Sequence, residues 1–111
     1  MLNTTGTENT AIGTAALVFN DTAEQNTVAG AFALHNHVSG NGNTAYGAHA
    51  LVSDTTGQLN TAVRVVALAN DDNGFNGSFN TGIGVLALFA NNGGDNTAVG
   101  AMAASGQRNG Q

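Results

Sequence analysis

The stretch NTAIGTAAL at residues 9–17 decides the fold, because the chain repeats it five more times. The later copies are NTVAGAFAL at 26–34, NTAYGAHAL at 43–51, NTAVRVVAL at 60–68, NTGIGVLAL at 80–88 and NTAVGAMAA at 96–104. Successive copies begin 17, 17, 17, 20 and 16 residues apart. A nearly fixed period of this length indicates an array of small, stacked supersecondary units.

Three positions of the copy hold one residue type throughout the array: the opening Asn, the Thr that follows it and the Ala at the eighth position. Identical residues at constant spacing are typical of stacked parallel strands about 4.8 Å apart, where like polar side chains can bond up the stack. A helix is disfavoured, since the motif glycine costs a helix about 1 kcal/mol. The sequence predicts an all-β, parallel β-roll or solenoid of about six coils. Its structural ladder is expected to be Thr10, Thr27, Thr44, Thr61, Thr81 and Thr97, with Ala16, Ala33, Ala50, Ala67, Ala87 and Ala103.

Each coil is expected to contain two short strands and two turns, because short alternating runs are separated by Gly, Asn and Asp clusters. Alternation along a strand places Ala11 and Gly13 on one face and Thr10 and Ile12 on the other. We expect the column of Ile12 to be buried, and the small residues at Ala11 and Gly13 to allow close approach of two backbones, either across a flattened roll or between subunits. That column contains Ile12, Tyr46, Val63, Ile83 and Val99.

The whole chain, 1–111, is predicted to be a single repeat domain. Residues 1–8 match the end of a preceding repeat, and residues 105–111 form a trailing inter-repeat segment. The array reads as an excised piece of a longer fibre, with a natural minimal fibre as the alternative. Three extra residues before Asn80, around Asp71-Asp72-Asn73-Gly74, are expected to form a longer outward loop.

The composition excludes several classes of function. Only two residues are Lys or Arg, against seven Asp or Glu, and the net charge is −5. Without a basic stripe or a polybasic patch, the chain is not expected to bind nucleic acid or a membrane surface, and no apolar run is long enough to span a bilayer. The absence of cysteine excludes disulfides and thiolate metal sites.

The Asn-Thr-Ala-Ile/Val-Gly core with its trailing Ala resembles the head repeats of trimeric autotransporter adhesins of the YadA type, over residues 9–104. Similar repeats occur in phage tail fibres. The resemblance implies a left-handed parallel β-roll, three of which pack around a threefold axis. It also implies a location on the outer surface of a cell or in a virion fibre.

A partner chain is also expected from the shortage of large side chains for the core of a thin roll. The most variable position of the copy is mostly apolar, and we expect it to face the partner. Its members are Ala15, Phe32, His49, Val66, Leu86 and Met102.

Few residues suggest a ligand. His35 and His37 flank one residue and have workable spacing for zinc or nickel, with His49 as a further candidate ligand, but solvated turn histidines are the simpler interpretation. The segment around Asp71 resembles a calcium loop without its distal Glu, and Gly93-Gly94-Asp95 resembles part of a calcium-binding repeat; plain turns are preferred for both. Arg64 is expected to form an inter-subunit salt bridge with Asp54 or Asp72, or to be solvated.

No arrangement of residues indicates catalysis or a cofactor, so the chain is predicted not to be an enzyme. The leading hypothesis is a structural and adhesive segment of a homotrimeric surface fibre that binds a host surface or extracellular matrix through many weak contacts. One alternative is an ice-binding solenoid that uses the threonine column. Another is a segment of a phage tail fibre.

Overall fold

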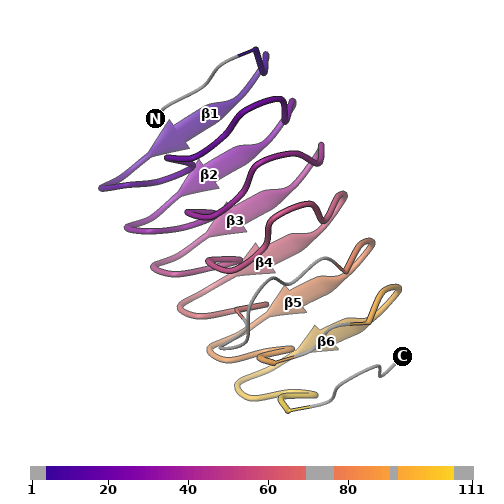
Figure 1. Cartoon of the computed structure of the whole chain (residues 1–111). Coiled ribbons are helices and arrows are strands. Elements are labelled where there is room, and N and C mark those ends of the chain that lie inside the picture. The colour runs from indigo at the N-terminus through magenta and orange to yellow at the C-terminus, as the bar shows by residue number, and fades with distance from the viewer. Residues whose placement is uncertain (1–4, 70–76, 91–92, 107–111) are drawn as a thin grey trace.

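Six short parallel strands stack into one sheet, and each strand belongs to a different repeat (Figure 1). The computed structural model describes residues 5–69, 77–90 and 93–106. The chain forms an all-β solenoid of about five turns. The strands are β1 (Thr10–Ile12), β2 (Thr27–Ala29), β3 (Thr44–Tyr46), β4 (Thr61–Val63), β5 (Thr81–Ile83) and β6 (Thr97–Val99).

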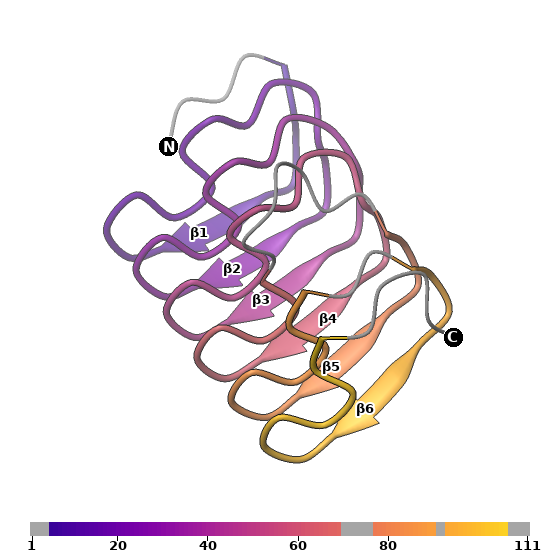
Figure 2. The ribbon, with the colours of Figure 1, turned by 60° about the horizontal axis from the view of Figure 1, so that its bottom comes forward.

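The register follows the sequence repeat. Thr10 pairs with Thr27, Thr27 with Thr44, and the same position pairs through to Thr97. The 20-residue repeat keeps this register, since Thr61 still pairs with Thr81. The predicted parallel stacking of the repeats is therefore confirmed. Figure 2 shows the coils following the same path one below another.

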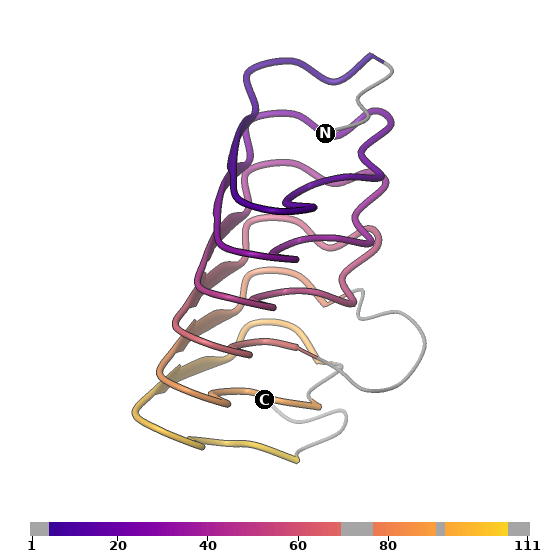
Figure 3. The same ribbon diagram turned by 90° about the vertical axis from the view of Figure 1, so that its left-hand side faces the viewer.

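Within the described residues each coil contains one strand, so the expectation of two strands per coil is wrong there. Beyond the strand, every second residue of the copy has a positive φ, as in Ala15 (55°) and Leu17 (49°). These left-handed residues prevent an extended conformation, which needs negative φ throughout. The amides still bond between coils: Leu17 N–H donates to Ala33 O at 3.1 Å, and Phe32 N–H donates to Thr14 O at 2.8 Å. The strands consequently form a single layer along one side of the stack (Figure 3).

The core consists of two inward columns, the middle residue of each strand and the Ala-Leu pair of each copy. Val28, Ala45, Leu34 and Leu51 are completely buried. Because the strand contributes only small residues or one Val to this interior, the leucines of the opposite wall fill it. The roll is therefore thin and filled by its own side chains.

The column of Ile12 lies on the outer face of the sheet, so its expected burial does not occur within one chain. Ile12, Tyr46 and Val99 expose 65%, 63% and 68% of their surface. Alternation along each strand points the middle residue inward, and the first and third residues must then point outward. The sequence pattern predicted the two faces correctly but assigned the interior to the wrong one.

The motif glycines allow adjacent coils of the stack to approach closely, whereas the sequence led us to expect this approach across the roll or between subunits. A Cβ placed on Gly47 would lie 2.6 Å from the carbonyl carbon of Arg64, and one on Gly30 would lie 2.5 Å from Gly47 O. These glycines have φ values of 132° and 142°, which side chains rarely adopt. Arg64 occupies the same position in the fourth copy with φ 102°.

Two expectations lie outside this description. The longer loop around Asp71-Asp72-Asn73-Gly74 falls outside the described residues, as do parts of the segments 1–8 and 105–111. Within the part that the structure describes, no helix has the length and apolar character needed to cross a membrane.

Candidate functional site

A column of buried asparagines holds the coils together. The backbone N–H of each motif Asn donates to the side-chain oxygen of the Asn one coil earlier, as from Asn43 to Asn26 at 2.8 Å and from Asn60 to Asn43 at 2.9 Å. Each side-chain amide donates to a turn carbonyl, as from Asn43 Nδ2 to Gly57 O at 2.8 Å. Asparagine suits this position because one short side chain carries both an acceptor and a donor. The members are Asn9, Asn26, Asn43, Asn60, Asn80 and Asn96.

The threonine column is in vertical register on the outer face of the sheet. Thr10 and Thr27 are exposed, whereas Thr44 and Thr61 are half-buried. The side-chain hydrogen bonds that join coils in the interior are made by the neighbouring asparagines. In the alanine column, Ala16, Ala33, Ala50, Ala67 and Ala87 are buried in the core, and Ala103 is half-buried.

The outer sheet face combines the threonine column with the apolar column beside it, and no strand residue is charged. We call this surface the sheet face: Thr10, Thr27, Thr44, Thr61, Thr81 and Thr97 together with Ile12, Ala29, Tyr46, Val63, Ile83 and Val99. Exposed apolar side chains in one contiguous row usually mark a contact surface. Sequence reasoning found both columns, but only the structure places them together on the outside.

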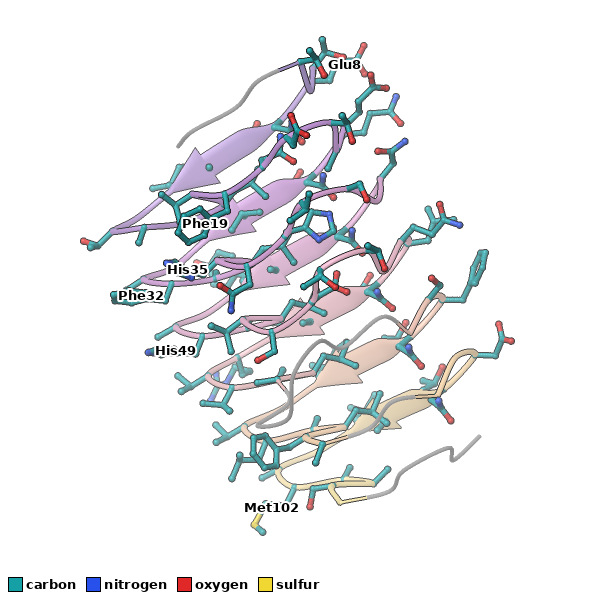
Figure 4. The ribbon with its side chains drawn as sticks, in the orientation of Figure 1. Glu8, Phe19, Phe32, His35, His49 and Met102 are labelled. Carbon is teal, nitrogen blue, oxygen red and sulfur yellow. The ribbon has the colours of Figure 1, made fainter. Side chains whose placement is uncertain are left out.

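The most variable position of the copy, which we call the variable column, is partly exposed. Its Phe32 and His49 belong to an aromatic cluster on the first three coils (Figure 4). Phe32 stacks on His49 with ring centres 5.3 Å apart and an angle of 9° between the planes. His35 lies 5.4 Å from Phe32 and 5.0 Å from Phe19. Phe19, which the sequence interpretation did not single out, exposes 52% of its surface. Rings gather here because residues of successive coils lie directly above one another.

The structure does not bring His35 and His37 together. The His35 ring belongs to the outer aromatic cluster, and its Nδ1 lies 3.0 Å from Asn36 Oδ1. His37 is completely buried, so the interpretation of both histidines as solvated is wrong for this one. His37 N–H donates to Leu34 O at 3.4 Å, so His35 and Asn36 lie in a turn and not on the extended path that the spacing argument assumed. Within the described ranges, no group of three or more His, Cys, Asp or Glu side chains is placed to hold a metal ion.

His37 instead pairs with Asp54, a contact that the sequence interpretation missed. His37 Nδ1 lies 3.2 Å from Asp54 Oδ2, and both side chains are fully buried. Gly57 N–H donates to Asp54 Oδ1 at 2.8 Å. Burial raises the pKa of Asp54, while its hydrogen bond and attraction to His37 and the Gly57 amide act in the opposite direction. The signal in the sequence was the spacing of 17 residues, which equals one coil and places these two positions in one column.

The other candidate residues from the sequence, Arg64 and the segment 93–95, do not form a common site. Arg64 is exposed, whereas Asp54, one of its expected partners, is buried against His37; the other, Asp72, lies outside the described residues. Gly93 O accepts a hydrogen bond from Asn80 Nδ2 at 2.9 Å, and Asp95 N–H donates to Ser78 O, so this segment serves the asparagine column as a turn.

Comparison with known proteins finds no family model that matches the chain, no similar curated protein and no similar solved structure. Its function is therefore argued from the surfaces described above.

Proposed function

We propose that the chain is a structural and adhesive segment of a homotrimeric surface fibre, in which the sheet face packs against neighbouring copies. The supporting observation is the row of exposed, uncharged side chains that runs from β1 to β6 on one side of the roll. A left-handed roll and a threefold axis are what the resemblance to adhesin head repeats implies. The expected location is the outer surface of a cell.

Burial energetics favour contact between copies through this face. Ile12, Tyr46 and Val99 each expose more than three fifths of their surface. Covering a large apolar side chain stabilises an interface by about 1.5–3 kcal/mol. Because successive coils present the row at regular intervals, contacts add along the whole stack. A closed ring of three copies covers the row in every copy, whereas open association would leave it exposed at the ends.

Adhesion is assigned to the surfaces that remain outside such a contact. Three rolls would present each exposed turn three times around the axis and once per coil. Many weak contacts to a host surface or extracellular matrix then act together, and avidity exceeds the affinity of one contact. The aromatic cluster around Phe32 is the most distinctive of these surfaces, so we assign the most variable position of the copy to adhesion and no longer to the contact with the partner chain.

An ice-binding solenoid is the second candidate, and the complete threonine column favours it. The hydroxyls repeat at the spacing of the strands along one side of the molecule. The adjacent column contains Tyr46 between Ala29 and Val63, which interrupts the flatness of the sheet face. We therefore prefer the contact between copies. A measurable thermal hysteresis at micromolar concentration would reverse this preference. A phage tail-fibre segment shares the proposed architecture and is the remaining alternative.

Light scattering tests the proposal. We expect the mass of three chains for the wild type and of one chain for Ile83→Asp, which places a charge on the sheet face. Val38→Asp is the matched control, since Val38 has a similar exposure (42% against 38%) and Asp21 stands in the same column one coil earlier. The variants should then differ in retention on a matrix-coated surface, with Val38→Asp retained like the wild type. A monomeric wild type would overturn the proposal.

A further inference from the structure

The buried pair of His37 and Asp54 connects two successive coils in the interior of the roll. Each side chain also closes its own turn. His37 Nε2 lies 2.7 Å from Gly40 O, and Asp54 Oδ1 accepts from Gly57 N–H at 2.8 Å. Asn20, one coil earlier, closes its turn in the same way through Nδ2 and Ala23 O. This position of the coil thus holds a polar residue that bonds three residues ahead.

These contacts determine where the protons are. Gly40 O can only accept, so His37 Nε2 must carry a proton. Asp54 Oδ1 accepts from an amide and therefore carries none. His37 Nδ1 and Asp54 Oδ2 face each other at 3.2 Å, and neither atom has another hydrogen-bond partner among the residues that the structure describes. A hydrogen bond between these two atoms requires one proton, whichever atom holds it. With that proton the pair is neutral overall, either as imidazole and carboxylic acid or as imidazolium and carboxylate.

Among the described residues, the surroundings of the pair contain no compensating charge. Asn43 Nδ2 lies 3.5 Å from His37 Nε2, and Asn26 Nδ2 donates to Gly40 O at 3.2 Å. Both are neutral amides. The nearest carboxylate on the neighbouring turn, Asp21, is exposed to solvent. The next position of the column, Asp71, lies outside the described residues. Adding or removing a proton would therefore leave a net charge in a buried site, which is strongly unfavourable.

We propose that His37 and Asp54 share one buried proton and that this proton makes the stability of the junction between the second and third coils depend on pH. In the unfolded chain, a histidine titrates near pH 6.5 and an aspartate near pH 3.9. Above about pH 6.5 the folded pair holds one proton more than the unfolded chain, so stability falls as pH rises. Between about pH 4 and pH 6.5 the folded pair and the unfolded chain each hold one proton on these groups, so the contribution of the pair to stability is constant. Below about pH 4 the unfolded chain holds more, and stability falls again.

The raised pKa of Asp54 agrees in sign with this scheme. A carboxyl whose folded-state pKa lies above its unfolded value contributes stability at low pH that is lost as pH rises through the folded pKa. At alkaline pH the pair therefore stabilises the junction less, because it loses the shared proton. At acid pH the junction is also less stable, because the unfolded chain binds a second proton on these two groups.

Asp54→Asn tests the proposal, because an amide can accept from Gly57 N–H and donate to His37 Nδ1 without a shared proton. Asn20 shows that the column accepts asparagine. The unfolding equilibrium of wild type and variant is measured by denaturant titration from about pH 4.5 to about pH 8. We expect the ratio of the two unfolding constants to shift about tenfold per pH unit in favour of the variant. Asp21→Asn, which removes an exposed carboxylate, should show a ratio that changes little with pH.

A ratio for Asp54→Asn that is constant across this range would overturn the proposal, since it would mean that the folded pair binds no proton. If the variant does not fold, nuclear magnetic resonance on the wild type decides. The Asp54 carboxyl carbon and His37 ring nitrogen shifts are expected to stay constant between about pH 5 and pH 6.5. A carboxyl midpoint near pH 3.9 together with a neutral His37 ring at pH 5 would contradict the shared proton. Stabilisation of the wild type but not Asp54→Asn by zinc would also contradict it, since the pair would then hold a metal.

Discussion

Arg64 is the residue that departs furthest from its repeat. It stands where the other copies have glycine, and it has φ 102° against 132° for Gly47 and 138° for Gly84. A side chain at such a φ stores strain of about 1–3 kcal/mol. The neighbouring copies impose this conformation, because the coil must follow the path of the coils on either side.

Arg64→Gly is expected to stabilise the fold by about 1 kcal/mol. Relief of strain exceeds the roughly 0.4–1 kcal/mol that glycine costs through the greater freedom of the unfolded chain. Denaturant unfolding measures the change. Arg64→Ala keeps a Cβ and should gain little, which separates backbone strain from the loss of charge. Equal gains in the two variants would show that the charge, not the backbone, was responsible.

Asn43 shows why the repeat requires asparagine at its first position. Its side chain accepts from Asn60 N–H and donates to Gly57 O, and the residue is fully buried. Asn43→Ala leaves both backbone groups buried without a partner. At about 1–3 kcal/mol for each of the two groups, the variant should lose roughly 2–6 kcal/mol of unfolding free energy.

Asn41→Ala is the matched control for this loss. Asn41 Oδ1 also accepts from a backbone amide, that of Glu24, at 2.8 Å, but Asn41 is exposed. Water can replace the lost bond there, so the expected cost is below about 1 kcal/mol. Similar losses for the two variants would contradict the assignment of the buried column as the support of the stack.

At the scale of the element, one coil combines an extended strand with a turn that alternates left-handed residues. The glycine that follows the strand is one of the points at which adjacent coils approach closely. Gly47 and Gly100 have nearly the same φ, 132° and 125°, but a Cβ on Gly100 would meet nothing nearer than the Ala103 Cβ at 4.0 Å. The two glycines therefore separate the cost of the conformation from the cost of the contact.

Gly47→Ala should destabilise the protein more than Gly100→Ala. Both introduce strain of about 1–3 kcal/mol. Only Gly47→Ala also places a methyl group 2.6 Å from the Arg64 backbone, and such overpacking typically adds a further 1–3 kcal/mol. Urea unfolding of both variants tests this difference. Equal destabilisation would mean that the coils can separate locally at little cost.

At the scale of the molecule, the proposed contact between copies makes stability depend on concentration. A protein whose folded form associates has a melting temperature that rises with its concentration. We expect this rise for the wild type and for Val38→Asp, and its loss in Ile83→Asp. Because Ile83 is outside the core, Ile83→Asp should remain folded by circular dichroism. An unfolded Ile83→Asp would instead indicate that a single roll cannot fold without its neighbours.

The sequence by itself determined the repeat, the parallel stacking and the register, because columns such as Thr10, Thr27 and Thr44 require vertical neighbours. Only the tertiary structure decided which face of the strand is interior. Alternation divides Ala11 from Ile12 but does not say which side the chain closes around, and the left-handed turns settle that by folding the leucines behind the small residues. His37 lies inward and His35 outward because His37 N–H closes a turn onto Leu34 O, whereas two-residue spacing places both side chains on one side only in an extended chain.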